Sequence, residues 1–272
     1  QNSIAIGWES AQTGQGTTAT AVGNTAGKTN QGENATAIGS GASVTNQGAA
    51  AVAIGAGAGV TTQSANAVAL GFEAGKTTQG LNSVAIGTGA GLTTQGTNAV
   101  AIGPRAGEIS QVQYAIAIGD YAGKSAQSGA AVAIGRNSGK VSQGNKAIAI
   151  GESSGGTNQG IDGIAIGFNS AGFFQGANAI ALGRRAGGTR QGTKGIAIGY
   201  EAALGTTVNA TYVSGNVVDS SLVVNDVSGI EVGMRVSGQG YVESTGVDFN
   251  VISVDAGTNT VALNTAATSQ PS

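Results

Sequence analysis

The tripeptide Ala-Ile-Gly, with close variants of its second residue, returns every sixteen residues of this chain without an insertion or a deletion. Its glycine occurs thirteen times, at Gly7, Gly23, Gly39, Gly55, Gly71, Gly87, Gly103, Gly119, Gly135, Gly151, Gly167, Gly183 and Gly199. Because an insertion in any copy would disturb the stacking of its neighbours, a constant repeat length indicates that each copy is one turn of a regular object.

Each copy predicts strands rather than helices. The residues before the glycine alternate between small and β-branched side chains, which is typical of a strand, and the chain has 49 glycines, which disfavour helices. We therefore expect an all-β fold, in which residues 1–205 form a parallel β-solenoid (β-roll) of thirteen sixteen-residue coils. With a spacing of about 4.8 Å between coils, the roll should be about 58 Å long.

The strand columns predict two different faces. The residues that flank the alanine of the strand are almost always Val, Ile or Leu, and we expect them to point into the coil. The alanine itself never varies, and no charge falls on the strand in any copy, so this face is expected to be covered. The economical cover is further copies of the same chain around an axis, which predicts an oligomer with these alanines facing the axis: Ala5, Ala21, Ala37, Ala53, Ala69, Ala85, Ala101, Ala117, Ala133, Ala149, Ala165, Ala181 and Ala197.

A second column predicts an amide ladder. Glutamine stands eight residues after the repeat glycine in every complete copy. We expect it to point inward, together with the residue two positions before it, which is mostly Thr. Stacked glutamines hydrogen-bond to one another in cross-β assemblies. The ladder would consist of Gln15, Gln31, Gln47, Gln63, Gln79, Gln95, Gln111, Gln127, Gln143, Gln159, Gln175 and Gln191.

The repeat ends near residue 205, and residues 206–272 predict a different domain. Short alternating runs such as SSLVVND and NTVALN are typical of strands, with turns expected at Val227–Gly229 and Ala256–Asn259. We expect a small all-β C-terminal module here.

Composition argues against several classes of function. The chain has no Cys and no His, which removes the commonest metal ligands and general base, so we expect no cofactor, no metal site and no enzyme activity. Its net charge of −2 lacks the basic excess of nucleic-acid-binding proteins. No apolar run approaches the length of a membrane span, so no membrane insertion is expected.

The two positions after the repeat glycine vary freely and carry large side chains, so they are expected at the outer edges of the coils. Aromatic and arginine side chains on an exposed edge suit contact with a glycan or protein receptor. These candidates for receptor contact are Trp8, Phe72, Tyr121, Phe168, Arg184, Arg185 and Tyr200. The alternative is that they cover the edges of the roll or pack between subunits.

The motifs NSVAIG at 82–87 and NAVAIG at 98–103 resemble the head repeats of YadA-like trimeric autotransporter adhesins. This resemblance implies a left-handed parallel β-roll and a homotrimer. The sixteen-residue variant A-G-x-T-x-Q-G is similar to repeats in bacteriophage tail-fibre and other virion proteins. It implies an attachment protein located on a virion or another extracellular surface, with other virion or fibre proteins and a host surface glycan or protein receptor as partners.

Three further functions stay open at this stage. The chain can be the head domain of a bacterial surface adhesin. The pairs Thr61–Thr62, Thr77–Thr78 and Thr93–Thr94 form a threonine array of the kind that ice-binding solenoids use. Carboxylates such as Glu73 and Glu152 admit a polysaccharide depolymerase.

Overall fold

The computed structural model describes residues 2–203, 221–223, 235–236, 249–255 and 260–265. The chain divides into two compact units, Gln1–Leu204 and Gly205–Ser272. The described residues include no helix that is long and apolar enough to cross a membrane.

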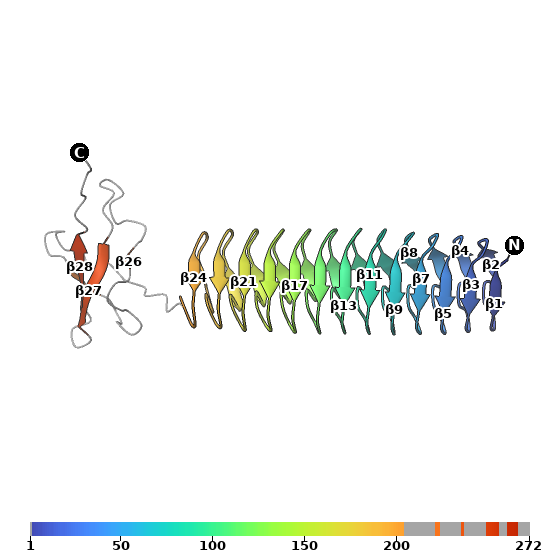
Figure 1. The fold of residues 1–272 in the computed structure, drawn as a ribbon, viewed down its shortest axis with the longest axis horizontal. Helices are drawn as coiled ribbons and strands as arrows, with labels where there is room; N and C mark the ends of the chain where they lie inside the picture. The colour runs from blue at the N-terminus through green and yellow to red at the C-terminus, as the bar shows by residue number, and fades with distance from the viewer. Residues whose placement is uncertain (1, 204–220, 224–234, 237–248, 256–259, 266–272) are drawn as a thin grey trace, which may run out of the picture. The chain divides into compact units, whose positions relative to one another are not determined.

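The first unit is a parallel β-solenoid of about twelve sixteen-residue turns, as the repeat predicts (Figure 1). The Ala-Ile-Gly strands form a thirteen-stranded sheet, here called sheet A. Its strands are β1 (Ile4–Ile6), β3 (Thr20–Val22), β5 (Thr36–Ile38), β7 (Val52–Ile54), β9 (Val68–Leu70), β11 (Val84–Ile86), β13 (Val100–Ile102), β15 (Ile116–Ile118), β17 (Val132–Ile134), β19 (Ile148–Ile150), β21 (Ile164–Ile166), β23 (Ile180–Leu182) and β24 (Ile196–Ile198).

The glutamine strands form a second parallel sheet of eleven strands, sheet B. They are β2 (Thr13–Gln15), β4 (Thr29–Gln31), β6 (Thr45–Gln47), β8 (Thr62–Gln63), β10 (Thr78–Gln79), β12 (Thr94–Gln95), β14 (Ile109–Gln111), β16 (Ser125–Gln127), β18 (Val141–Gln143), β20 (Thr157–Gln159) and β22 (Phe173–Gln175). A single bridge between Gln175 and Gln191 extends the pairing by one coil.

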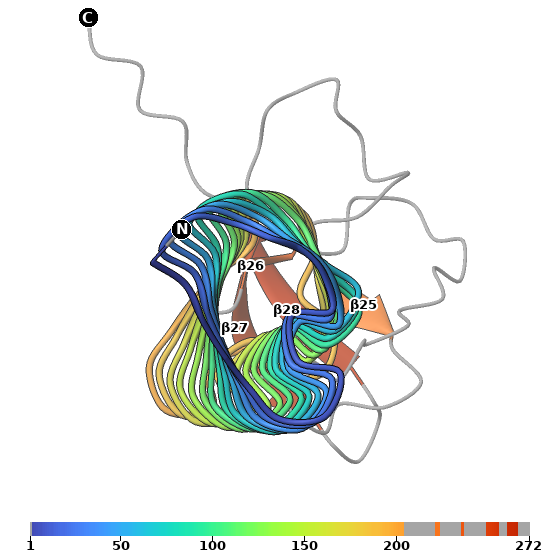
Figure 2. The same cartoon turned by 90° about the vertical axis from the view of Figure 1, so that its right-hand side faces the viewer.

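Successive coils stack in register, each residue beside its counterpart sixteen positions on. Ala101 pairs with Ala117 in sheet A, and Gln111 pairs with Gln127 in sheet B. The corners are bonded as well: Arg105 N donates to Thr88 O at 2.8 Å. Viewed along the roll, the coils nearly superimpose, with a steady rotation from one to the next (Figure 2).

The interior of the roll reverses the expected orientation of the sheet A strands. The alanine column points inward: Ala21 to Ala181 are fully buried within one chain, while Ala5 lies exposed in the first coil. The trimer-axis role expected for Ala5, Ala21, Ala37, Ala53, Ala69, Ala85, Ala101, Ala117, Ala133, Ala149, Ala165, Ala181 and Ala197 is therefore wrong, because this column points into the roll, where a side chain enclosed by its own chain cannot contact another subunit; Ala5 is exposed only because it lies in the first coil.

The reason for this reversal is the narrow interior of a sixteen-residue coil. The alanine column packs against a second column of small residues three positions after the repeat glycine, such as Ala106 and Ala122. A Cβ built on Gly75 would lie 3.4 Å from the Cβ of Ala69 and 2.7 Å from Gln79 Oε1. No room is left for Val or Ile, which therefore point outward.

The repeat glycines are required by conformation and by contact. Gly103 has a φ of +118°, and a Cβ on it would lie 2.9 Å from the carbonyl of Gly119 in the next coil. L-residues rarely adopt this φ, and no side-chain carbon fits so near a backbone carbonyl. Two independent requirements therefore select glycine in this column.

In the second unit, four strands form an antiparallel sheet in the order β25 (Ser221–Val223), β28 (Thr260–Thr265), β27 (Phe249–Asp255), β26 (Arg235–Val236). The register of β27 and β28 shifts between Val251 and Ser253. The turns expected at Val227–Gly229 and Ala256–Asn259 lie outside the described residues. The C-terminal β module, with its boundary at residue 206, stays a prediction.

Candidate functional site

The roll presents four outward surfaces: the outer faces of sheets A and B and two rows of corners. Each corner is a turn closed by a backbone hydrogen bond, such as Ala106 N to Gly103 O at 3.2 Å. The third residue of that turn, Arg105, has a φ of +53°, which is the conformation a type II turn requires at this position. The two central residues of each turn thus stand at the edge of the coil and are free to vary.

The outer face of sheet A carries the residues that flank the buried alanines, here called the aliphatic columns. Their members in the inner coils are half-buried or exposed; Leu70, Ile134 and Leu182 have exposed fractions of 42%, 36% and 41%. One column consists of Ile4, Thr20, Thr36, Val52, Val68, Val84, Val100, Ile116, Val132, Ile148, Ile164, Ile180 and Ile196, and the other of Ile6, Val22, Ile38, Ile54, Leu70, Ile86, Ile102, Ile118, Ile134, Ile150, Ile166, Leu182 and Ile198. Such a continuous uncovered apolar face is typical of an interaction surface.

The glutamine column lies inside the roll and crosses it. Gln111 Nε2 donates to Val100 O of sheet A at 2.8 Å and to Gln127 Oε1 of the next coil at 3.1 Å. Such rungs join the glutamines from Gln31 to Gln79 and again from Gln95 to Gln191. Gln95 Oε1 has no partner. The threonines two residues before the glutamines were expected to point inward with them. This expectation is wrong, because Thr77 and Thr93, for example, are exposed.

The seven candidate contact residues do not form one site. Trp8, Phe72, Phe168 and Tyr200 have exposed fractions of 67%, 55%, 45% and 66%. Trp8 and Phe72 stand four coils apart in the same corner row, which is about 19 Å at the usual strand spacing. The structure instead gathers several candidates at one place along this corner row, and at a second place it surrounds one candidate with other residues.

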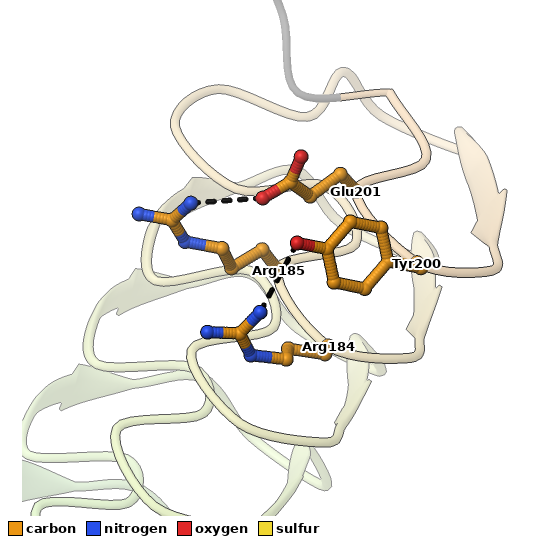
Figure 3. A network of polar contacts seen from close by, with 4 residues as sticks. All are labelled: Arg184, Arg185, Tyr200 and Glu201. Carbon is orange, nitrogen blue, oxygen red and sulfur yellow. Dashed lines mark hydrogen bonds and ion pairs between the residues drawn. The ribbon is translucent and has the colours of Figure 1, made fainter.

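The first cluster lies on the last three coils. The guanidinium of Arg184 lies 5.5 Å from the ring centroids of both Phe168 and Tyr200. Its Nη1 also donates to the Tyr200 hydroxyl at 3.1 Å (Figure 3). Cation–π contacts of this length contribute about 0.5–1 kcal/mol each at exposed sites.

Beside this stack, Arg185 Nη1 bonds Glu201 Oε1 at 2.8 Å (Figure 3). The hydrogen bond from Arg185 holds the pKa of the Glu201 carboxyl below its ordinary value, and the same bond raises the pKa of Arg185. The pair therefore ties the last coil to the one before it at neutral pH.

The second cluster surrounds Tyr121 and contains residues that sequence reasoning missed. Lys124 Nζ lies 5.0 Å from the ring centroid, and the Arg105 guanidinium and Lys140 Nζ lie 5.5 Å and 5.6 Å from it. Arg105 Nη1 also donates to the Tyr121 hydroxyl at 3.0 Å. The spacing of sixteen residues between Arg105 and Tyr121 was the signal that could have found this cluster.

The two carboxylates considered for catalysis are engaged elsewhere. Glu73 accepts a hydrogen bond from Lys76 Nζ at 2.6 Å, and Glu152 pairs with Arg136. They stand about five coils apart, or about 24 Å, whereas glycosidase carboxylates lie about 5–9.5 Å apart. Within the described residues, no three acidic side chains gather into a metal-binding group.

The threonine pairs occupy an outward position on three coils only. Thr61, Thr77 and Thr93 are exposed, but the next coil carries the exposed Ile109 in the same column. The array is thus short, and a bulkier side chain ends it.

These features define a parallel β-roll with a buried small-residue core and an apolar outer sheet. Residues 31–58 and 77–91 match the YadA head domain repeat, in two copies. The chain therefore carries YadA head domain repeats in a solenoid of sixteen-residue turns. Repeats of this type are structural adhesin modules rather than catalytic ones, and they occur in trimeric, surface-exposed heads. Neither the curated proteins nor the solved structures include a match.

Proposed function

We propose that this chain is a homotrimeric fibre segment that serves attachment, with the aliphatic columns of three subunits facing the trimer axis and the corner residues facing outward. The observation that carries this proposal is the outer face of sheet A, which is aliphatic along the roll except at Thr20 and Thr36, although its own chain leaves it uncovered. The matched YadA head repeats support the same arrangement, because that family implies trimeric assembly.

A trimer would explain the aliphatic side chains on the outer face of sheet A, which a monomer would leave in contact with water. Fully burying a Val or Ile side chain contributes at most about 1.5–3 kcal/mol, and most coils present two half-buried or exposed aliphatic side chains on this face. Thr20 and Thr36 are the only polar members of the aliphatic columns. Association would remove from water the largest apolar surface of the roll.

Light scattering on the purified chain tests the assembly. The expected mass is three times 26.1 kDa. A monomer at micromolar concentration would overturn the proposal.

Cysteine cross-linking tests which face is buried. The chain has no Cys, so a single Val100→Cys substitution places one thiol on the proposed axis face. Oxidation should give covalent dimers, because three copies of this position would meet near the axis. The matched Ser142→Cys variant, on an exposed position of sheet B, should stay uncross-linked. Equal cross-linking of both variants would contradict the assigned face.

The proposed location is a virion, as part of a tail fibre or similar appendage with other fibre proteins and a host receptor as partners. The head of a bacterial surface adhesin is the second candidate, and the match to the YadA head repeat supports it. Immunogold labelling with antibodies against the roll distinguishes the two. Label on purified virions supports the first, and label on intact cells free of virions supports the second.

A further inference from the structure

The cluster around Tyr121 differs from the ion pairs of the roll. Lys28, Lys76, Arg136 and Arg185 each pair with a carboxylate on their own or a neighbouring coil. Around Tyr121, in contrast, three cations converge on one ring.

Only one carboxylate serves these three cations. Glu108 Oε2 lies 3.5 Å from Lys124 Nζ, and its side chain is 13% exposed. In the described part of the chain, neither Arg105 nor Lys140 has a carboxylate within ion-pair distance. Apart from Arg136, which pairs with Glu152, the segment 104–140 carries three cations and two acids, Glu108 and Asp120, so the corner keeps an excess of one positive charge.

The cations also form a line. Arg105, Lys124 and Lys140 belong to three successive coils, so they are spread over about 10 Å along the roll. Arg105 is exposed, and Lys140 and Tyr121 are half-buried, so both the charges and the ring remain accessible from solvent.

Like charges held together around a ring repel one another, and an anion placed among them relieves that repulsion. A line of cations along a convex corner matches an extended polymer with repeated charges. The ring of Tyr121 adds an apolar surface against which a sugar ring can pack.

We propose that Arg105, Tyr121, Lys124 and Lys140 form a binding site for an anionic cell-surface polysaccharide, one that bears carboxylate or sulfate groups. This inference rests on the proposed attachment function and names the class of receptor. In a trimer the site would occur three times, and multivalent contact would strengthen the binding of a long polymer.

The test compares dextran sulfate with unmodified dextran of the same length on the full chain. The chain should bind dextran sulfate, and binding should weaken between 50 and 200 mM NaCl, because salt screens exposed charges at about these concentrations. Unmodified dextran should not bind. Equal binding of the two polymers would overturn the inference.

A pair of variants distinguishes this site from a general effect of charge. Lys140→Gln removes one of the converging cations, whereas Lys146→Gln removes an exposed cation six residues later on the opposite corner row. We expect Lys140→Gln to weaken binding by about threefold, the value of one exposed ion pair, and Lys146→Gln to have less than half that effect. Equal losses in both variants would contradict the site.

Tyr121 offers a second check. Tyr121→Phe keeps the ring and removes the bond from Arg105, so it should bind nearly as well as the native chain, whereas Tyr121→Ala should lose the packing surface. Stronger binding of single-stranded DNA than of dextran sulfate would overturn the assignment to polysaccharide. The mass of the same sample is measured by light scattering. A trimer that does not bind dextran sulfate would contradict only this inference, whereas a monomer would contradict the proposed function.

Discussion

At the residue scale, the identity of most positions follows from the space that one coil leaves for the next. The glycine that follows the glutamine column shows this well, because its φ is not positive and contact alone decides it. A Cβ on Gly160 would lie 2.5 Å from the backbone N of Ala177 in the next coil, whereas a Cβ on Gly192 would meet nothing within 4 Å.

Gly160→Ala should therefore destabilise the roll while Gly192→Ala should not. We expect a loss of about 1–3 kcal/mol for the first, as for overpacking elsewhere, and a change within about 0.5 kcal/mol for the second. Ser64 and Val112 occupy this column naturally. The hydrogen bonds from their backbone N to a carbonyl O of the next coil are 2.9 and 3.0 Å long, whereas those from Gly48 and Gly96 are 2.7 and 2.8 Å long. Thermal unfolding checks the pair, and equal midpoints would contradict the argument from space.

The glutamine column supplies a second prediction at this scale. Gln111→Met removes an amide that bonds sheet A and both neighbouring glutamines, and it leaves Gln127 Oε1 unpaired in the interior. Since burying an unpaired polar group costs about 1–3 kcal/mol, the free energy of unfolding should fall by about 2–4 kcal/mol.

Gln15→Met is the matched control in the same column. Gln15 is only half-buried, and its amide bonds to two backbone carbonyls. Its replacement should cost less than about 1 kcal/mol. Chemical denaturation of the two variants decides, and a cost at Gln15 that matches the cost at Gln111 would argue against a cooperative ladder.

At the scale of the elements, the sequence alone predicts the strands but not the direction in which their side chains point. Alternation fixes that Ala101 and its neighbours Val100 and Ile102 lie on opposite faces. It does not say which face is inside. We expected the larger side chains inside, as in most cores, but a sixteen-residue coil encloses only Ala, Gly, Ser and the flat amides of glutamine. The second column of small residues, at Ala106 and its equivalents, indicated a narrow interior that only small side chains can fill.

The candidate site was predictable only in part for a related reason. Variability at the turn positions identified Tyr121 and Arg184 as outward residues. The cations around Tyr121 come from two different positions of the repeat, and only the stacking of coils brings Lys124 and Lys140 to the same ring.

A deletion tests the coil as a unit. Removal of residues 145–160 joins Gly144 to Ile161 and keeps every later residue in its column, because sixteen residues are one period. This variant should fold cooperatively with a small loss of stability, as expected of stacked repeats. Removal of 145–159 instead leaves one extra residue, and a shift of one residue would place the aliphatic side chains of the next strand inside. Circular dichroism during heating should show a midpoint lower by at least about 5 °C for the shorter deletion, a shift of about 2 kcal/mol. Identical unfolding of the two variants would contradict a strict period.

At the scale of the whole molecule, the roll divides its surfaces by task. The limited space inside and between coils determines the residue types of the interior and of the stacking glycines. The proposed contact between subunits determines those of the aliphatic columns. Neither constraint acts on the corner residues. The corners are therefore where one chain can differ from another without loss of the fold. Both clusters of cations and aromatic rings, at Tyr121 and at Arg184, lie on corners.

Assembly and folding should be linked in such a molecule, since a free chain would leave the two aliphatic columns partly exposed to water along the roll. For a protein that is stabilised by association, the midpoint of thermal unfolding rises with concentration. We expect the midpoint to rise by several degrees between about 1 and 100 µM, because mass action favours the folded trimer. Calorimetry at the two concentrations measures this directly. Ile118→Lys, which places a charge on the aliphatic face, should lower the midpoint and the trimer fraction together, whereas Ser110→Lys on the exposed side of sheet B should change neither. A midpoint that stays constant with concentration, for a chain that is trimeric by light scattering, would mean that the roll is stable alone and that its apolar face serves assembly without serving folding.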